Sequence, residues 1–298
     1  LKVACMINAP CLTGRAWPIP QHSRLILSLK ASLLIPEKAL ELVGELAFNL
    51  SHPSKLEYAA GFKPPVELSC GLIMVPHGTT PSNVNHFFQD HSESDLSQLT
   101  PEGLALAEKG AAMFVESYGP SIREQPGSWF FYRSPLRRTA TTAEPFIAAL
   151  HSLGISAPEV IVDPDLIEIT HGSWAGLSVK GLAAAGRLED AEEGRRYREG
   201  SFLAKALDGS GESKLEVIKR AAEWLRSLEA RHGGKSQNVV VFGHGTFQNS
   251  VELLLQCYPE RAAADLFSRN PTGGTHMRRG EAHVLAQLRS IEVDRSMM

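Results

Sequence analysis

The sequence predicts an α/β fold, a three-layer αβα sandwich with a mostly parallel central sheet, preceded by an N-terminal extension. The first observation is a set of short, continuously apolar runs, such as residues 72–75 and 239–242, which are typical of strands buried on both faces. The second is that longer amphipathic segments separate these runs, which favours parallel strands joined by helices. The third is a change near residue 70, before which repeated prolines interrupt the chain. We therefore expect an extension over residues 1–69, packed on a main domain over residues 70–298.

The composition is that of an ordinary soluble protein. Hydrophobic residues make up 43% of the chain and charged residues 21%, with a formal net charge of -3. This charge gives no general attraction to nucleic acid or to an anionic membrane, and no apolar run approaches the ~20 residues of a membrane span. The four cysteines form no CxxC pair, so neither a zinc site nor a disulfide framework is predicted. These features favour a reducing compartment, and we expect a cytoplasmic protein.

Two segments stand apart from the strand and helix pattern. Within the extension, residues 36–50 are predicted to form a helix, because Pro36 suits a first turn and an apolar stripe follows it. Within the main domain, residues 186–202 carry many charges of both signs. Such a run indicates either a solvated helix or, because it contains several arginines, a basic lid over an anionic substrate.

The first half of the main domain gives two strands and two helices. Residues 72–75 are the first strand, and a polar loop follows them. Thr100 can cap a helix and Pro101 fits its first turn, so the next helix is expected to begin there. Residues 129–132 form the second strand, and the helix after it is expected to open at Ser134.

The second half continues the same alternation. Residues 161–162 are apolar and lead toward Glu168, while residues 214–228 show apolar side chains at helical spacing. Residues 238–242 are another buried strand. A late alternating run over residues 283–293 is expected to be an edge strand.

Three of the expected strands are followed closely by polar, titratable residues. His77 follows the first strand, Arg138 lies just after the second, and His244 follows the strand at residues 238–242. Because the carboxyl ends of parallel strands face one crevice, these side chains are expected to meet there. A neutral imidazole can attack phosphorus, an arginine binds phosphate oxygens, and a carboxylic acid such as Glu168 can protonate the leaving oxygen. The combination indicates phosphoryl transfer.

Five short motifs occur in order between about residues 70 and 255. They are Val75-Pro76-His77-Gly78 continuing to Asn83, Ser134-Pro135-Leu136-Arg137-Arg138-Thr139 with Thr142-Ala143, Glu168 with Gly172, Trp174 and Gly176, Gly211-Glu212-Ser213 with Glu216 and Arg220, and Phe242-Gly243-His244-Gly245. In this order they resemble the motifs of the histidine phosphatase superfamily, the group that contains the cofactor-dependent phosphoglycerate mutases.

The resemblance implies a metal-independent phosphatase, a phosphoric monoester hydrolase, that acts on a small anionic phosphorylated metabolite. It implies that His77 forms a phosphohistidine, with Glu168 and His244 as the other catalytic residues. Arg138, His244 and Asn83 are expected to bind the phosphate. Further candidates for substrate binding are Thr79, Thr80, Arg137 and Thr246. No metal, cofactor, nucleic acid or membrane is expected to take part, and the oligomeric state stays open, with a dimer as one option.

One residue departs from the family's pattern. The family has an arginine immediately before the nucleophilic histidine, and this chain has Pro76, which carries neither a charge nor a backbone N–H. Losing one charge-assisted contact to phosphate typically costs about 1.5–3 kcal/mol. An arginine elsewhere would have to compensate, and the candidates are Arg133, Arg137, Arg15 and Arg24.

Pro76 also keeps alternative functions open. One is a catalytically impaired relative that binds a ligand or a protein partner, and another is a pocket that performs chemistry other than phosphoryl transfer. A phosphoglycerate mutase ranks lower, because the spacing from Glu168 to Gly211 is short for the extra cover that such mutases carry.

Overall fold

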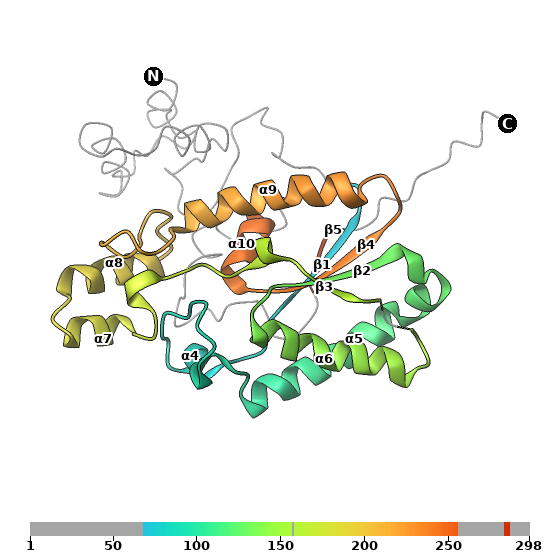
Figure 1. The fold of residues 1–298 in the computed structure, drawn as a ribbon, viewed down its shortest axis with the longest axis horizontal. Helices are drawn as coiled ribbons and strands as arrows, with labels where there is room; N and C mark the ends of the chain where they lie inside the picture. The colour runs from blue at the N-terminus through green and yellow to red at the C-terminus, as the bar shows by residue number, and fades with distance from the viewer. Residues whose placement is uncertain (1–67, 157, 256–282, 287–298) are drawn as a thin grey trace, which may run out of the picture.

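The computed structural model describes residues 68–156, 158–255 and 283–286, which contain the predicted α/β sandwich (Figure 1). The strands pair in the order β3-β2-β4-β1-β5, and the first four run parallel while β5 is antiparallel to β1. Their bounds are Gly71–Pro76 for β1, Trp129–Arg133 for β2, Val160–Val162 for β3, Asn238–Gly243 for β4 and His283–Ala286 for β5. The predicted fold class is confirmed.

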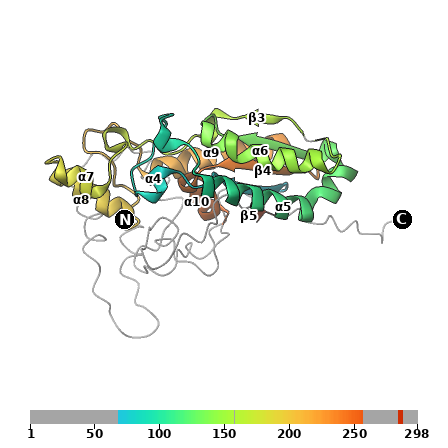
Figure 2. The same ribbon diagram turned by 90° about the horizontal axis from the view of Figure 1, so that it is seen from below.

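Helices cover both faces of the sheet. α5 (Pro101–Glu124) and α6 (Arg137–Ser152) pack on one face, and α9 (Lys214–His232) and α10 (Gly245–Leu254) on the other (Figures 1 and 2). The other helices, α4 (Pro81–Val84), α7 (Val179–Ala184) and α8 (Leu188–Arg198), lie beyond one end of the sheet. Single 3-10 turns occupy Asp95–Ser97, Pro126–Ser128, Pro164–Leu166 and Gly172–Trp174. None of the helices in the described ranges is long and apolar enough to cross a membrane.

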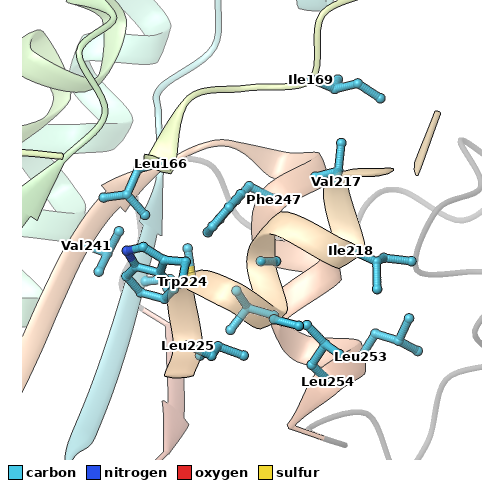
Figure 3. Close-up of a cluster of buried hydrophobic side chains, with 14 of the residues drawn as sticks. Leu166, Ile169, Val217, Ile218, Trp224, Leu225, Val241, Phe247, Leu253 and Leu254 are labelled. Carbon is cyan, nitrogen blue, oxygen red and sulfur yellow. The ribbon is translucent and has the colours of Figure 1, made fainter. Parts of the chain in front are cut away.

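Alternating residues of the central strands feed two hydrophobic clusters, one on each face of the sheet. In β1, Leu72 and Met74 join the cluster under α9 and α10, while Ile73 and Val75 join the cluster under α5 and α6. Figure 3 shows the first cluster, in which the rings of Trp224 and Phe247 meet edge to face with centroids 5.6 Å apart. Burial on both faces explains why these strands read as continuous apolar runs.

Most of the predicted elements form close to the expected residues. α5 begins at Pro101, and the Thr100 side chain accepts a hydrogen bond from the Gly103 N–H, as its N-cap position predicted. α6 begins at Arg137 rather than at Ser134, because Leu136 is the N-cap. The expected late strand is found at residues 283–286. Its remainder, the helix at residues 36–50 and nearly all of the extension lie outside the described residues.

Candidate active site

Three polar residues leave neighbouring parallel strands at the same edge of the sheet. His77 follows β1, Ser134 follows β2, and His244 follows β4, which lies between the other two. The backbone N–H of His77 donates to the Gly243 carbonyl at 2.9 Å, and that of Ser134 donates to the Phe242 carbonyl at 3.1 Å. The parallel register thus brings together groups that are far apart along the chain.

The two histidine rings lie next to one another in the interior. Their centroids are 5.3 Å apart with the planes at 64°, and His77 is 2% exposed. Nδ1 of His77 lies 2.7 Å from the Gly78 carbonyl, which can only accept a hydrogen bond. The ring proton therefore sits on Nδ1 in the neutral form, and the lone pair sits on Nε2. This tautomer is the one that an attacking imidazole needs.

His244 is completely buried and is held by Ser134. Its Nε2 lies 2.8 Å from Ser134 Oγ, which itself accepts from the Leu136 N–H at 3.4 Å. The hydroxyl can donate its proton to Nε2, and in that tautomer the ring proton sits on Nδ1, a buried atom with no hydrogen-bond partner among the described residues. Burial, assisted by the charge of Arg138, holds the pKa of His244 well below its usual range. The ring is therefore a neutral donor with one unused N–H.

Arg138, near the start of α6, buries a guanidinium with donors to spare. The residue is 1% exposed, and Nη2 donates to the Asp90 carbonyl at 3.1 Å. Within the described part of the chain, its Nε and Nη1 are buried without a hydrogen-bond partner. Burial lowers the pKa of Arg138, and the nearby carboxylates of Glu168 and Glu93 oppose this shift. Unpaired buried donors are costly, so this arrangement favours the binding of an anion.

Glu168 lies in the segment between the turns Pro164–Leu166 and Gly172–Trp174 and is 9% exposed. Its Oε1 accepts from the Ile169 N–H at 2.9 Å. The imidazole of His91 donates from Nε2 to the Glu168 backbone carbonyl at 2.7 Å. The carboxyl group is close enough to Arg138 for its charge to act on that guanidinium. The predicted acid thus shares the site with the predicted phosphate ligand.

Glu212 fixes the segment that follows Glu168. Its Oε2 accepts from the Thr170 N–H at 3.1 Å, and its own N–H donates to the Thr170 carbonyl at 2.8 Å. Arg220 on α9 completes the contact, with Nε 3.0 Å from Glu212 Oε1 and Nη2 3.2 Å from Oε2. The fourth sequence motif therefore supports the acid-bearing segment.

Asn83 and Thr80, both predicted at the site, hydrogen-bond to each other. They form a capping box at the start of α4, in which Asn83 Oδ1 accepts from the Thr80 N–H at 3.1 Å. The Asn83 amide also faces Gln89 Oε1, with Nδ2 at 3.4 Å. Gln89 Nε2 is buried with no partner among the described residues. Phosphate binding by Asn83 stays a prediction.

The remaining substrate-binding candidates lie nearer the surface. Arg137 is exposed, and its backbone N–H donates to Glu93 Oε1 at 2.9 Å. Thr79 and Thr246 are partly exposed. Thr79 follows the His77 turn and its carbonyl accepts from the Thr100 N–H at 2.8 Å. All three lie close in the sequence to the buried groups of the candidate site, and their role in substrate binding stays a prediction.

The described residues include potential metal ligands and the thiol of Cys70. No group of three or more His, Cys, Asp or Glu side chains there could hold a metal ion. Cys70 is free and buried, and burial raises its pKa to about 11. The thiol is therefore protonated and unreactive near neutral pH.

The sequence matches the model of one known protein family. A family model described as the histidine phosphatase superfamily (branch 1) matches residues 72–281, well over half of the chain. The chain belongs to the histidine phosphatase superfamily. Phosphoserine phosphatase 1 of Hydrogenobacter thermophilus is 33% identical over 173 residues, which cover 58% of this chain and 70% of that protein.

The chain is also similar to solved structures. Bacillus stearothermophilus YhfR is 23% identical, with a TM-score of 0.52, over 74% of this chain and 96% of that one. A mycobacterial glucosyl-3-phosphoglycerate phosphatase is 24% identical with a TM-score of 0.48, over 65% of this chain and 84% of that one. The first likeness supports the α/β assignment.

Pro76 stands immediately before His77, where the family has an arginine. Pro76 ends β1, is buried and pairs with Gly243. Of the arginines expected to compensate, Arg133 donates from Nη1 to the Ser134 carbonyl at 3.0 Å, and Arg137 is exposed. The other two, Arg15 and Arg24, lie outside the described residues. Arg133 is thus near the strand ends, but it already binds a backbone oxygen there.

The charged segment expected to be a solvated helix or a basic lid is α8 with its flanks. Its arginines pair with carboxylates one turn away on the same helix, as in Arg187–Asp190 at 2.6 Å, Arg195–Glu192 and Arg196–Glu193. Arg198 instead lies over the Phe88 ring, 4.3 Å from its centroid. This internal pairing favours the solvated helix.

Three residues that hydrogen-bond to the candidate site or its flanks are not predicted from the sequence. His91 and Gln89 lie in a polar loop that has no periodic pattern, and only their spatial neighbours mark them. Thr142 stood in a motif without a role, yet its hydroxyl contacts the His77 turn. The helical pattern of α6 could have indicated that the Thr142 hydroxyl faces inward. It does not indicate that the partner is Gly78, 64 residues away.

Proposed function

We propose that this chain hydrolyses a small phosphorylated metabolite through a phosphohistidine on His77. The observation that carries the proposal is the buried Arg138, close enough for its charge to act on His244, which lies against His77; two of its donor nitrogens have no partner among the described residues. The expected enzyme class, a phosphoric monoester hydrolase, is confirmed by the family and its named phosphatases. The covalent intermediate, independence of metals and a cytoplasmic location remain part of the proposal.

The first half of the reaction transfers the phosphoryl group to the protein. Nε2 of His77 attacks phosphorus with its lone pair as the bond from phosphorus to the leaving oxygen breaks. Arg138 and the Nδ1–H of His244 donate to the phosphoryl oxygens and stabilise their charge. The protonated carboxyl of Glu168 gives its proton to the leaving oxygen, so that the product departs as an alcohol.

The second half returns the protein to its starting state. Glu168, now a carboxylate, accepts a proton from a water molecule as the water oxygen attacks the phosphohistidine. The bond between phosphorus and Nε2 breaks, and its electron pair returns to the His77 ring. Inorganic phosphate leaves, and no electron donor or acceptor is needed.

The substrate class is inferred from the family and from the donors at the proposed site. One buried guanidinium and one imidazole N–H are suited to a single phosphate monoester group. Because a relative that is 33% identical is named phosphoserine phosphatase 1, phosphoserine is the first metabolite to test. The substrate is the partner that we propose, and the oligomeric state stays open.

The test uses the full chain with an aryl phosphate and with phosphoserine, in the presence of a chelator. We expect phosphate release without metal, and an acid-labile phosphoprotein when the reaction is quenched rapidly. His77→Ala should abolish both, whereas His151→Ala, an exposed histidine on α6, should change neither. Activity that survives His77→Ala, or that requires a metal, would contradict the proposal.

Pro76 favours a second candidate, a relative that binds a phosphorylated ligand without turning it over. The chain lacks the charge that the family carries beside its nucleophile, and Arg133 binds a backbone carbonyl. This candidate predicts a wild-type rate equal to that of His77→Ala, with a gain of activity in Pro76→Arg. A wild-type rate far above that of His77→Ala would exclude it.

A further inference from the structure

The turn that carries His77 is bonded to the helix that carries Arg138 through one hydroxyl group. The Gly78 N–H donates to Thr142 Oγ1 at 2.9 Å, and the Thr142 hydroxyl donates to the Arg138 carbonyl at 2.7 Å. Thr142 is completely buried. One side chain therefore connects the residue after the predicted nucleophile to the backbone of the predicted phosphate ligand.

This bond also bears on the orientation of the His77 ring. The Gly78 carbonyl receives the Nδ1–H of His77 at 2.7 Å, and the direction of that carbonyl depends on the backbone angles of Gly78. The bond from the Gly78 N–H to Thr142 restrains those angles. Removing the hydroxyl would leave the N–H unpaired and allow the peptide, and with it the imidazole, to turn.

The other side of the turn is packed against α5. A Cβ atom at Gly78 would lie 2.5 Å from the Gly103 carbonyl oxygen, so the two backbones are in close contact there. α5 therefore limits the turn by steric contact, and α6 limits it by the Thr142 hydrogen bond. A methyl group in place of the hydroxyl would keep the packing but lose the directional restraint.

We propose that Thr142 is a positioning residue, which holds His77 Nε2 in line with a phosphoryl group bound at Arg138. The inference rests on the proposed function, because it assigns Thr142 a part in the attack by His77. Displacing a reacting atom by about 1 Å can reduce a rate about 100-fold. Thr142 thus acts on the chemical step through His77 and has no contact with substrate of its own.

The experiment compares Thr142→Val, which keeps the shape, with Thr142→Ser, which keeps the hydroxyl. The matched control is Ser250→Ala on α10, since Ser250 Oγ is fully buried and also donates to the carbonyl four residues earlier, at 2.9 Å. We expect Thr142→Val to lower kcat and phosphohistidine formation about 10- to 100-fold. Inhibition by inorganic phosphate should change little, and Thr142→Ser and Ser250→Ala should keep most of the wild-type kcat.

A second readout does not depend on turnover. Nitrogen NMR of the imidazoles reports whether the ring proton sits on Nδ1 or Nε2, and Thr142→Val should shift this balance for His77 while leaving His232 unchanged. If the wild type had no phosphatase activity, the proposed function would fail, and the NMR comparison would still decide the role of Thr142. If valine prevents folding, Thr142→Ala takes its place.

Several outcomes would overturn the inference. One is a Thr142→Val protein with wild-type kcat and an unchanged His77 spectrum. Another is a Thr142→Ser protein as impaired as Thr142→Val, which would point to a packing role. A third is an equal loss in Ser250→Ala, which would show that any lost buried hydroxyl has this effect.

Discussion

At the scale of single residues, two of the buried histidines, His244 and His232, favour the neutral form, so their protonation opposes folding. Burial lowers the pKa of His244 well below its usual value and also lowers that of His232, which lies beside Tyr132 and Gln237. His244 lies at the proposed site, where its neutral ring would offer a donor to an anion. His232, the last residue of α9, packs against the ring of Phe130, with centroids 4.6 Å apart.

This burial gives a prediction for stability against pH. Below about pH 6.5 an unfolded chain protonates both histidines, whereas the folded chain resists, so the unfolded state binds more protons. The free energy of unfolding should therefore fall as pH decreases from about 6.5 to 5, with His244 contributing up to about 1.4 kcal/mol per pH unit and His232 acting in the same direction. Urea unfolding across this range measures the slope.

The control for this prediction is His244→Gln, which removes one titrating ring. Its slope should be smaller than that of the wild type by the contribution of one histidine, whereas His151→Gln, at an exposed position, should leave the slope unchanged. Equal slopes for His244→Gln and the wild type would show that His244 does not carry the effect.

At the scale of elements, the close approach of α5 to the His77 turn depends on glycine at one helix position. Gly103 is the third residue of α5, and a Cβ there would lie 2.2 Å from the Thr79 carbonyl oxygen and 2.7 Å from the Thr79 nitrogen. Alanine is normally the better helix former by about 1 kcal/mol. Here the clash with backbone atoms outweighs that preference.

We predict that Gly103→Ala lowers the free energy of unfolding by about 1–3 kcal/mol, the usual effect of overpacking, and also lowers kcat. Gly181→Ala is a close control, because Gly181 is likewise the third residue of its helix and donates to its N-cap hydroxyl at 3.0 Å. A Cβ there meets only ordinary contacts of 3.5 Å or more. Chemical unfolding should find Gly181→Ala neutral or stabilised; the same result for Gly103→Ala would refute the argument.

The elements themselves were largely predictable, and their connections were not. Continuous apolar runs located β1, β2 and β4, and the N-cap at Thr100 located the start of α5 within one residue. The sequence predicts the start of α6 too early, because serine is a typical N-cap residue and Ser134 precedes the helix. Its hydroxyl instead pairs with His244, 110 residues away, and that choice depends on strand register.

The sequence predicts which residues form the candidate site, but it does not predict the hydrogen bonds that hold them in place. His77, Arg138 and His244 follow from strand ends and motifs, because parallel strands bring their carboxyl ends together. The contacts through Thr142, His91 and Glu212 join segments with no local pattern. Such long-range hydrogen bonds are set by tertiary packing, which a single sequence does not record.

At the scale of the whole molecule, the proposed site is built from four segments that are far apart along the chain. Its predicted phosphate ligands lie after β1, at the start of α6 and after β4, and the acid lies in the segment after β3. Arg138 buries Nε and Nη1 with no partner among the described residues, which is unfavourable for folding. An anion that fills the site would remove this cost and link these segments.

Inorganic phosphate should therefore raise the melting temperature of the whole domain. A ligand that binds only the folded state adds about 2.7 kcal/mol at a concentration 100 times its Kd. Thermal unfolding in phosphate, compared with chloride at equal ionic strength, measures the effect. Arg138→Ala should lose it, whereas Arg226→Ala, which removes an exposed arginine of α9, should retain it. The same phosphate-dependent rise in Arg138→Ala would mean that the anion binds elsewhere on the molecule.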